Sequence, residues 1–205
     1  MDNLDIEKIK EAYNALKHSD HYVRTPVLFH VQKKYGISDD LDLYLKLENL
    51  QVMGSFKIRG VYNQMRHLPE GAGTTDKMLL AMSAGNYGKA FAYLTHQMSL
   101  KAKVLMPDTA PDNREETIKK YGALVERMPT SELLPRVEEY SNKHNMVHLH
   151  SYDDPILIQG HGSQNNVREL QSWKSSGHED NIHSIRLIPS LCWHQRLQAV
   201  SPVRR

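Results

Sequence analysis

Apolar residues recur along the N-terminal third of the chain with two different spacings. Between residues 4 and 16 their spacing is close to that of one face of a helix: Leu4, Ile6, Ile9, Ala12, Tyr13 and Leu16. Between residues 41 and 47 they alternate with polar residues, as in a strand: Leu41, Leu43, Leu45 and Leu47. Pro26 separates the two patterns, because the residue before a proline favours extended backbone. The sequence therefore predicts an amphipathic helix over 4–16 and a strand over 41–47.

The chain between residues 77 and 150 alternates short apolar runs with amphipathic segments. The apolar runs predict strands over 77–82, 103–106, 124–127 and 146–150, and the segments between them predict helices over 88–98, 111–121 and 131–144. Strands that alternate with helices of this length form right-handed βαβ crossovers and a parallel sheet. We therefore predict one small doubly wound α/β domain over residues 78–150.

Two further segments have less regular patterns. A loop over 48–54 precedes Ser55, a suitable N-cap for a helix that ends near His67. After Ser163 the apolar spacing fits neither period, and we predict low order over 165–205 with short helical pieces at most near 167–173 and 194–200. That tail also holds six basic and three acidic residues, both tryptophans and the single cysteine, so its composition differs from the rest of the chain.

The overall composition narrows the function classes. A net charge of +2 in 205 residues gives no strong field for a nucleic acid, and no apolar run approaches the ~20 residues that span a bilayer. The N-terminal residues show no apolar signal core, and Cys192 alone forms no internal disulfide. The sequence thus predicts a cytoplasmic protein without a nucleic-acid or membrane partner.

Two segments carry residues suited to catalysis. Lys57 lies in Gly54-Ser55-Phe56-Lys57-Ile58-Arg59-Gly60, where apolar neighbours favour the free amine that attacks an aldehyde. The second segment, Ser83-Ala84-Gly85-Asn86-Tyr87-Gly88, joins a predicted strand to a predicted helix, where unpaired amides and the helix dipole favour an anion. A Schiff-base lysine and an anion-holding loop together indicate pyridoxal-phosphate chemistry.

Each of these features also has a simpler interpretation. A single lysine is commonly a surface charge, and a glycine-rich turn between strand and helix needs no ligand. Asp153-Asp154-Pro155 is typical of a turn, and Glu48 is compatible with a structural carboxylate before the lysine turn. His144, His148 and His150 lie close in sequence, but without a paired-cysteine or H-E-x-x-H pattern we predict no metal site.

Several separated motifs resemble one enzyme family. The segments 48–60 and 83–88 look like those of the fold-type II pyridoxal-phosphate enzymes, in the branch of threonine/serine dehydratase and serine racemase. Further matches follow the same order along the chain: Arg24-Thr25-Pro26-Val27, Met106-Pro107 with Ala110-Pro111, Tyr121-Gly122-Ala123, and Asp153-Asp154-Pro155 with Gly160-His161-Gly162-Ser163. The resemblance covers about residues 5–163.

The resemblance implies the fold and the roles of the site residues. It implies the architecture of the tryptophan synthase β subunit, in which residues 1–77 start a large domain, 78–150 form the small domain and 151–164 return to the large one. Lys57 would form the Schiff base with pyridoxal 5'-phosphate and remove the substrate α-proton, Phe56 would lie against the cofactor ring, and Asn86 would bond the ring hydroxyl. Ser83, Gly85, Asn86 and Tyr87 would hold the substrate carboxylate. The implied reaction converts L-serine or L-threonine to a 2-oxoacid and ammonia.

The sequence also departs from the family at three places. Ala84 replaces the second serine that serves racemases as an acid/base, which favours elimination over racemisation. Tyr87 stands where a histidine is common in the family, so the preference between L-serine and L-threonine is left open. Residues 164–205 lack the glycine run that the resemblance places around the cofactor phosphate, and Gly177 stands alone there. The open alternatives are a truncated, non-catalytic isoform that forms an oligomer with a full-length enzyme, a serine racemase-like activity, and a small-ligand binding module.

Overall fold

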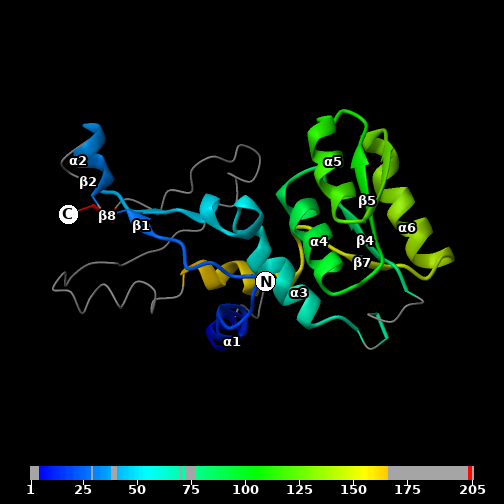
Figure 1. Ribbon diagram of the computed structural model, residues 1–205, viewed down its shortest axis with the longest axis horizontal. Coiled ribbons are helices and arrows are strands. Elements are labelled where there is room, and N and C mark those ends of the chain that lie inside the picture. Colours follow the sequence, from blue (N-terminus) through cyan, green and yellow to red (C-terminus); the bar gives the residue numbers. More distant parts are fainter. Residues whose placement is uncertain are drawn as a thin grey trace.

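A computed structural model describes residues 5–28, 30–37, 41–69, 71–72, 77–165 and 203–204 of the protein (Figure 1). The helices are α1 (Ile6–Lys17), α2 (Val31–Tyr35), α3 (Lys57–Arg66), α4 (Asn86–Gln97), α5 (Asp112–Lys120), α6 (Leu133–Lys143) and α7 (Pro155–Gly162). The strands are β1 (Val27–Leu28), β2 (Leu41–Asp42), β3 (Leu45–Lys46), β4 (Leu79–Met82), β5 (Ala102–Pro107), β6 (Leu124–Met128), β7 (Val147–Leu149) and β8 (Val203–Arg204). Four 3-10 turns are η1 (Glu48–Leu50), η2 (Val52–Gly54), η3 (Thr130–Glu132) and η4 (Ser163–Asn165). None of the helices in the described ranges is long and apolar enough to cross a membrane.

The main sheet has the strand order β6-β5-β4-β7, and every neighbouring pair is parallel. Successive side chains of a strand point to opposite faces, so both faces of these apolar strands need a cover. On one face Leu79 and Ala81 belong to the same buried cluster as Phe91 of α4 and Ile118 of α5. On the other face Leu80, Leu105 and Met128 pack against Leu133 and Val137 of α6. Figure 1 shows α4 and α5 on one side of the sheet and α6 on the other, which confirms the predicted parallel α/β arrangement.

The strand order changes direction beside β4. β5 and β6 lie on one side of β4, whereas β7, which follows α6, lies on the other. In open α/β sheets the crevice at such a switch point, beyond the carboxyl ends of the strands, is the usual place for a ligand. The loop 83–88 leaves the carboxyl end of β4 and therefore lies at this point.

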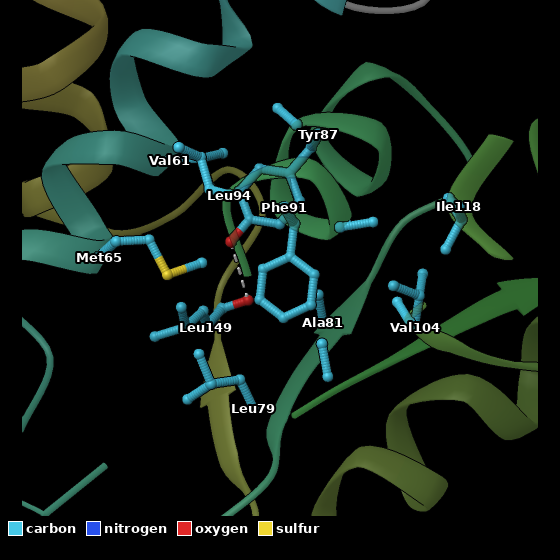
Figure 2. Close-up of a cluster of buried hydrophobic side chains, with 14 of the residues drawn as sticks. Val61, Met65, Leu79, Ala81, Tyr87, Phe91, Leu94, Val104, Ile118 and Leu149 are labelled. Atoms are coloured by element: carbon cyan, nitrogen blue, oxygen red, sulfur yellow. Dashed lines mark hydrogen bonds between the residues drawn. The ribbon is translucent and has the colours of Figure 1, made fainter. Parts of the chain in front are cut away.

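Helix α3 packs against the small α/β unit through the same apolar cluster. Val61 and Met65 of α3 lie beside Phe91 and Leu94 of α4, over Leu79 of the sheet (Figure 2). All five side chains are nearly or fully buried, and burying each contributes about 1.5–3 kcal/mol. This packing fixes the helix that begins at Lys57 against the helix that follows the glycine-rich loop. The division of the chain into domains at residues 77 and 150 remains a prediction.

Helices α3 and α7 approach each other closely enough to require glycine at the contact. A Cβ atom on Gly160 would lie 2.7 Å from the Arg59 carbonyl oxygen and from Gly60 Cα, and a Cβ atom on Gly60 would overlap the His161 ring. Asp154 caps α7, since its Oδ1 accepts from the amides of Ile156 (2.7 Å) and Leu157 (3.3 Å). The predicted turn at Asp153-Asp154-Pro155 is therefore the start of a helix that the sequence pattern did not reveal.

The predicted strand over 41–47 is wrong as a single element. The structure has two two-residue strands: β3 pairs antiparallel with β1, and β2 pairs with β8. Between them the Leu43 amide donates to Gln32 Oε1 (2.8 Å), and the Leu43 carbonyl accepts from the Val31 amide (3.0 Å). These hydrogen bonds of Leu43 to α2 replace the strand-to-strand hydrogen bonds that a continuous strand would make. The predicted helical pieces over 167–173 and 194–200 lie outside the described residues.

Candidate functional site

Lys57 is placed by the tight turn that starts α3. Met53 and Gly54 both have left-handed backbone, with φ of 67° and 72°, which reverses the chain after η2. Ser55 Oγ then accepts from the Lys57 amide at 3.4 Å, and Phe56 is the N-cap residue. The predicted helix is therefore present, and its N-cap is Phe56 instead of the predicted Ser55. Lys57 itself is 8% exposed, which excludes the interpretation as a surface charge.

Phe56, Lys57 and His161 form one compact group. Lys57 Nζ lies 3.5 Å from His161 Nε2 and 4.9 Å from the centre of the Phe56 ring. The Phe56 and His161 rings meet edge to face with centroids 4.8 Å apart. Burial, together with the positive charges of Lys57 and Arg59, holds the pKa of His161 well below its ordinary value, so the imidazole is neutral. The lysine amine thus lies beside both an aromatic ring and a neutral imidazole.

A buried ion pair joins α3, the helix that begins at Lys57, to Glu48 of η1. Arg59 donates through Nε and Nη2 to the Glu48 carboxylate, at 2.7 and 2.8 Å, and Thr25 Oγ1 donates to the same group at 2.7 Å. Burial alone raises the pKa of Glu48, but its hydrogen bonds with Arg59 and Thr25 and the positive charge of Arg59 outweigh burial and lower it. Gln51 makes two further bonds, both 2.8 Å, to the amide and carbonyl of Val23. These contacts support the structural interpretation of Glu48.

The loop 83–88 is organised by Ser83. Its Oγ accepts from the amides of Gly85 (3.2 Å) and Gly88 (3.1 Å), and a Cβ atom on Gly88 would lie 2.8 Å from the Ser83 carbonyl. Arg114 Nη1 donates to the Ala84 carbonyl at 3.3 Å. Within the described part of the chain, the amides of Asn86 and Tyr87 at the start of α4 have no hydrogen-bond acceptor. The loop therefore presents two free N–H groups and the positive end of a helix.

Tyr87 reaches away from this loop into the core. Its hydroxyl donates to Gln64 Oε1 (2.8 Å) and approaches the Leu149 carbonyl (3.4 Å), the contact that is dashed in Figure 2. Its ring stacks with Phe91, and burial together with the Asp154 carboxylate raises its pKa. The predicted substrate contact of Tyr87 therefore rests on its backbone amide, because the side chain joins α4 to α3.

Replacing Tyr87 with phenylalanine tests this placement. Removing the hydroxyl leaves Gln64 Oε1 without its donor, which we expect to lower the free energy of unfolding by about 1–2 kcal/mol. Urea unfolding measures the change, with Tyr152→Phe, at a residue that is 63% exposed, as the control. A Tyr87→Phe protein that unfolds like the wild type would contradict the assignment of the hydroxyl to the core.

The structure brings the lysine turn and the glycine-rich loop to neighbouring positions. Val52 and Met53 of η2 and Ala84 of the loop pack against the same buried cluster, and α3 packs along α4. His161 was not predicted as a site residue: it lies 104 residues from Lys57 in sequence, and the matched segment 160–163 was assigned no role at the lysine. His148 and His150 lie with ring centroids 5.7 Å apart, and the described ranges contain no group of three or more residues suited to a metal.

The residues present fit the reactive end of pyridoxal phosphate. The amine of Lys57 is buried beside an aromatic ring, and a polar atom of the neighbouring His161, Nδ1, is buried without a partner in the described ranges. At the loop, a Cβ atom on Gly85 would meet nothing closer than Arg114 Nη1 at 3.7 Å, so the backbone there has room for a ligand. We assign no residue to the cofactor phosphate.

Comparisons with known proteins agree with this chemistry. The family described as "Pyridoxal-phosphate dependent enzyme" matches residues 18–164. The catabolic L-threonine dehydratase of Staphylococcus aureus is 32% identical over 142 residues, covering 68% of this chain and 40% of that protein. The biosynthetic L-threonine dehydratase of Halalkalibacterium halodurans is 32% identical over 170 residues, covering 80% and 39%.

Solved structures give the same result. The serine racemase of Dictyostelium discoideum superposes with a TM-score of 0.68 and 30% identity, over 81% of this chain and 52% of that one. The maize serine racemase gives a TM-score of 0.69 and 26% identity, over 82% and 50%. The chain thus spans about 40% of the length of the curated relatives and about half of the solved chains. This chain belongs to the family of pyridoxal-phosphate dependent enzymes.

Proposed function

We propose that the protein is a pyridoxal-phosphate dependent dehydratase that releases ammonia from L-serine or L-threonine. The observation that carries the proposal is the burial of Lys57 against Phe56, next to a loop whose free amides lie at the switch point of the sheet. The threonine dehydratases among the relatives support the reaction class. The substrate side chain is the part of the proposal that rests on this likeness alone.

Each residue has a role that its position supports. When bound, the cofactor supplies an electron sink for the charge that develops at the substrate α-carbon. Lys57 Nζ would hold the cofactor through its aldehyde carbon, and once the substrate amine has displaced it, the free lysine amine would take the α-proton as a general base. Phe56 excludes water from one side of this amine. The amides of Asn86 and Tyr87 and the hydroxyl of Ser83 bind the substrate carboxylate, with Gly85 leaving room for it, and the Asn86 side chain bonds the ring hydroxyl.

Ala84 favours elimination over racemisation. A racemase needs a second acid/base group on the face of the substrate opposite the lysine. Ala84 offers no such group: its side chain packs against the apolar cluster, and its carbonyl accepts from Arg114. Among the described residues, Lys57 is therefore the one proton carrier that we place at the α-carbon, and it removes the proton from one face of the substrate.

The test is turnover of the 205-residue chain with millimolar pyridoxal phosphate. We expect a visible absorbance band of bound cofactor, and a 2-oxoacid with equimolar ammonia from L-serine or L-threonine. Chiral chromatography of the remaining amino acid is expected to show elimination in excess over racemisation. Racemisation as the main reaction, or a folded chain that binds cofactor and turns over neither amino acid, would contradict the proposal.

A second function, as a non-catalytic partner of a full-length enzyme, is favoured by exposed apolar side chains in the described N-terminal part of the chain. Five large apolar side chains between residues 23 and 50 are 44–65% exposed: Val23, Leu28, Tyr35, Ile37 and Leu50. Where such side chains form one contiguous patch, the patch marks a surface that another polypeptide covers. A chain that is folded but retains no cofactor would favour this second function.

A further inference from the structure

The contact between His161 and Lys57 has no role in the reaction as set out above. α7 is fixed on α3 by three contacts that do not involve His161: Asn63 Nδ2 donates to the Ile156 carbonyl (2.8 Å), Gln64 Nε2 donates to Asp154 Oδ2 (2.6 Å), and Gly160 seats against Gly60. The absence of a side chain on Gly60 leaves room for the imidazole. These contacts hold His161 Nε2 at 3.5 Å from Lys57 Nζ.

The two ring nitrogens of His161 have different surroundings. Nε2 faces the lysine amine, whereas Nδ1 is buried and has no hydrogen-bond partner among the described residues. A neutral imidazole carries its hydrogen on one nitrogen only. Orphaned buried N–H groups are rarer in proteins than orphaned acceptors, so the arrangement favours hydrogen on Nε2. The N–H group then points at Lys57.

The charges around the ring are consistent with this tautomer. Besides burial, the groups that lower the pKa of His161 are Lys57 in its protonated form and the Arg59 guanidinium, both on α3. A second proton on the imidazole would add a buried positive charge close to the Arg59 guanidinium. A neutral Nε2–H group can donate only to the lone pair of an unprotonated lysine, which is the form that attacks an aldehyde.

We propose that His161 is a positioning residue for Lys57: its Nε2–H group donates to the lysine nitrogen, favours the free amine and directs it toward the cofactor aldehyde. This inference rests on the proposed function, because it assigns a purpose to the same lysine. It also explains why a histidine is placed in a helix between two glycines, with Phe56 packed against its ring edge to face.

Three substitutions distinguish a role of His161 in positioning Lys57 from a role in packing alone. His161→Gln keeps an N–H donor near the place of Nε2, His161→Asn keeps one near Nδ1, and His161→Leu fills the space without a donor. Reductive methylation of the cofactor-free chain with isotope-labelled formaldehyde and cyanoborohydride, followed by peptide mass spectrometry, gives the reaction rate at each lysine. The exposed Lys8 and Lys101 serve as references within the same chain.

We expect the rate at Lys57, relative to the references, to fall about tenfold in His161→Leu and His161→Asn, and to stay within about threefold of wild type in His161→Gln. Urea unfolding shows whether the rates follow stability instead. Lys57 reacting at the wild-type rate in the leucine variant, or equally slowly in all three variants, would overturn the inference. As a measurement without substitution, ¹⁵N NMR of the wild-type imidazole is expected to show hydrogen on Nε2, and hydrogen on Nδ1 would also overturn it. Attachment of pyridoxal phosphate to Lys57 is a separate measurement, so failure of the proposed function is distinguishable.

Discussion

Replacing Lys57 with alanine is expected to lower turnover of L-serine and L-threonine by at least about 1,000-fold, because the variant loses both the cofactor attachment and the general base. The side chain is buried at the first turn of α3, and neither Phe56 nor His161 offers an amine in its place. The bound-cofactor absorbance is expected to disappear in the same variant.

Steady-state release of 2-oxoacid measures this effect at saturating pyridoxal phosphate. Lys101→Ala, which removes an exposed lysine before β5, is the matched control and is expected to leave the rate unchanged. Circular dichroism is used to check that the Lys57→Ala chain is folded. A folded variant that keeps more than about a tenth of the wild-type rate would contradict the role of Lys57.

Replacing Glu48 with glutamine is expected to have the largest effect on stability, a loss of about 3–5 kcal/mol. The carboxylate and the Arg59 guanidinium have side chains that are 4% and 0% exposed, so the substitution leaves a buried positive charge without its partner. The total free energy of unfolding of a domain is about 5–15 kcal/mol, so this loss removes a large share of it. The effect on function would follow, because Arg59 lies two residues from Lys57.

The pH dependence gives this prediction a second signature. Because the pKa of Glu48 is lowered on folding, the ionised carboxylate stabilises the fold fully above its ordinary pKa of 4.5, and that contribution is lost as the pH falls toward the folded value. The difference in the free energy of unfolding between wild type and Glu48→Gln, measured with urea, is therefore expected to become smaller below about pH 4.5. Glu11→Gln is the control, since Glu11 is 64% exposed and 3.8 Å from Arg66. A loss below about 1 kcal/mol at neutral pH would contradict the buried ion pair.

The elements of the α/β unit could be predicted because each leaves a local pattern in the sequence: a short apolar run for a strand and an apolar stripe for a helix. β4 and β5 are short apolar runs covered on both faces, and α4 and α6 have apolar stripes that face them. α7 could not be found in the same way. Its glycines disfavour a helix in isolation, and they are tolerated because α3 approaches too closely for side chains.

The site was predictable where one segment carries the chemistry and not where distant segments meet. Lys57 and the loop at Ser83 each carry a local motif. The contact of His161 with Lys57 arises from packing between α3 and α7, and the direction of the Tyr87 side chain arises from the packing of α4 on α3. A local motif predicts which residue belongs to the site. The tertiary packing determines whether its side chain or its backbone faces the ligand.

The measurement that tests the account most directly is the location of the cofactor on the chain. The protein is equilibrated with pyridoxal phosphate, reduced with borohydride and digested, and the pyridoxyl group is located by peptide mass spectrometry. The account predicts one group per chain, on Lys57. A pyridoxyl group on another lysine, or one spread evenly over the exposed lysines, would contradict it.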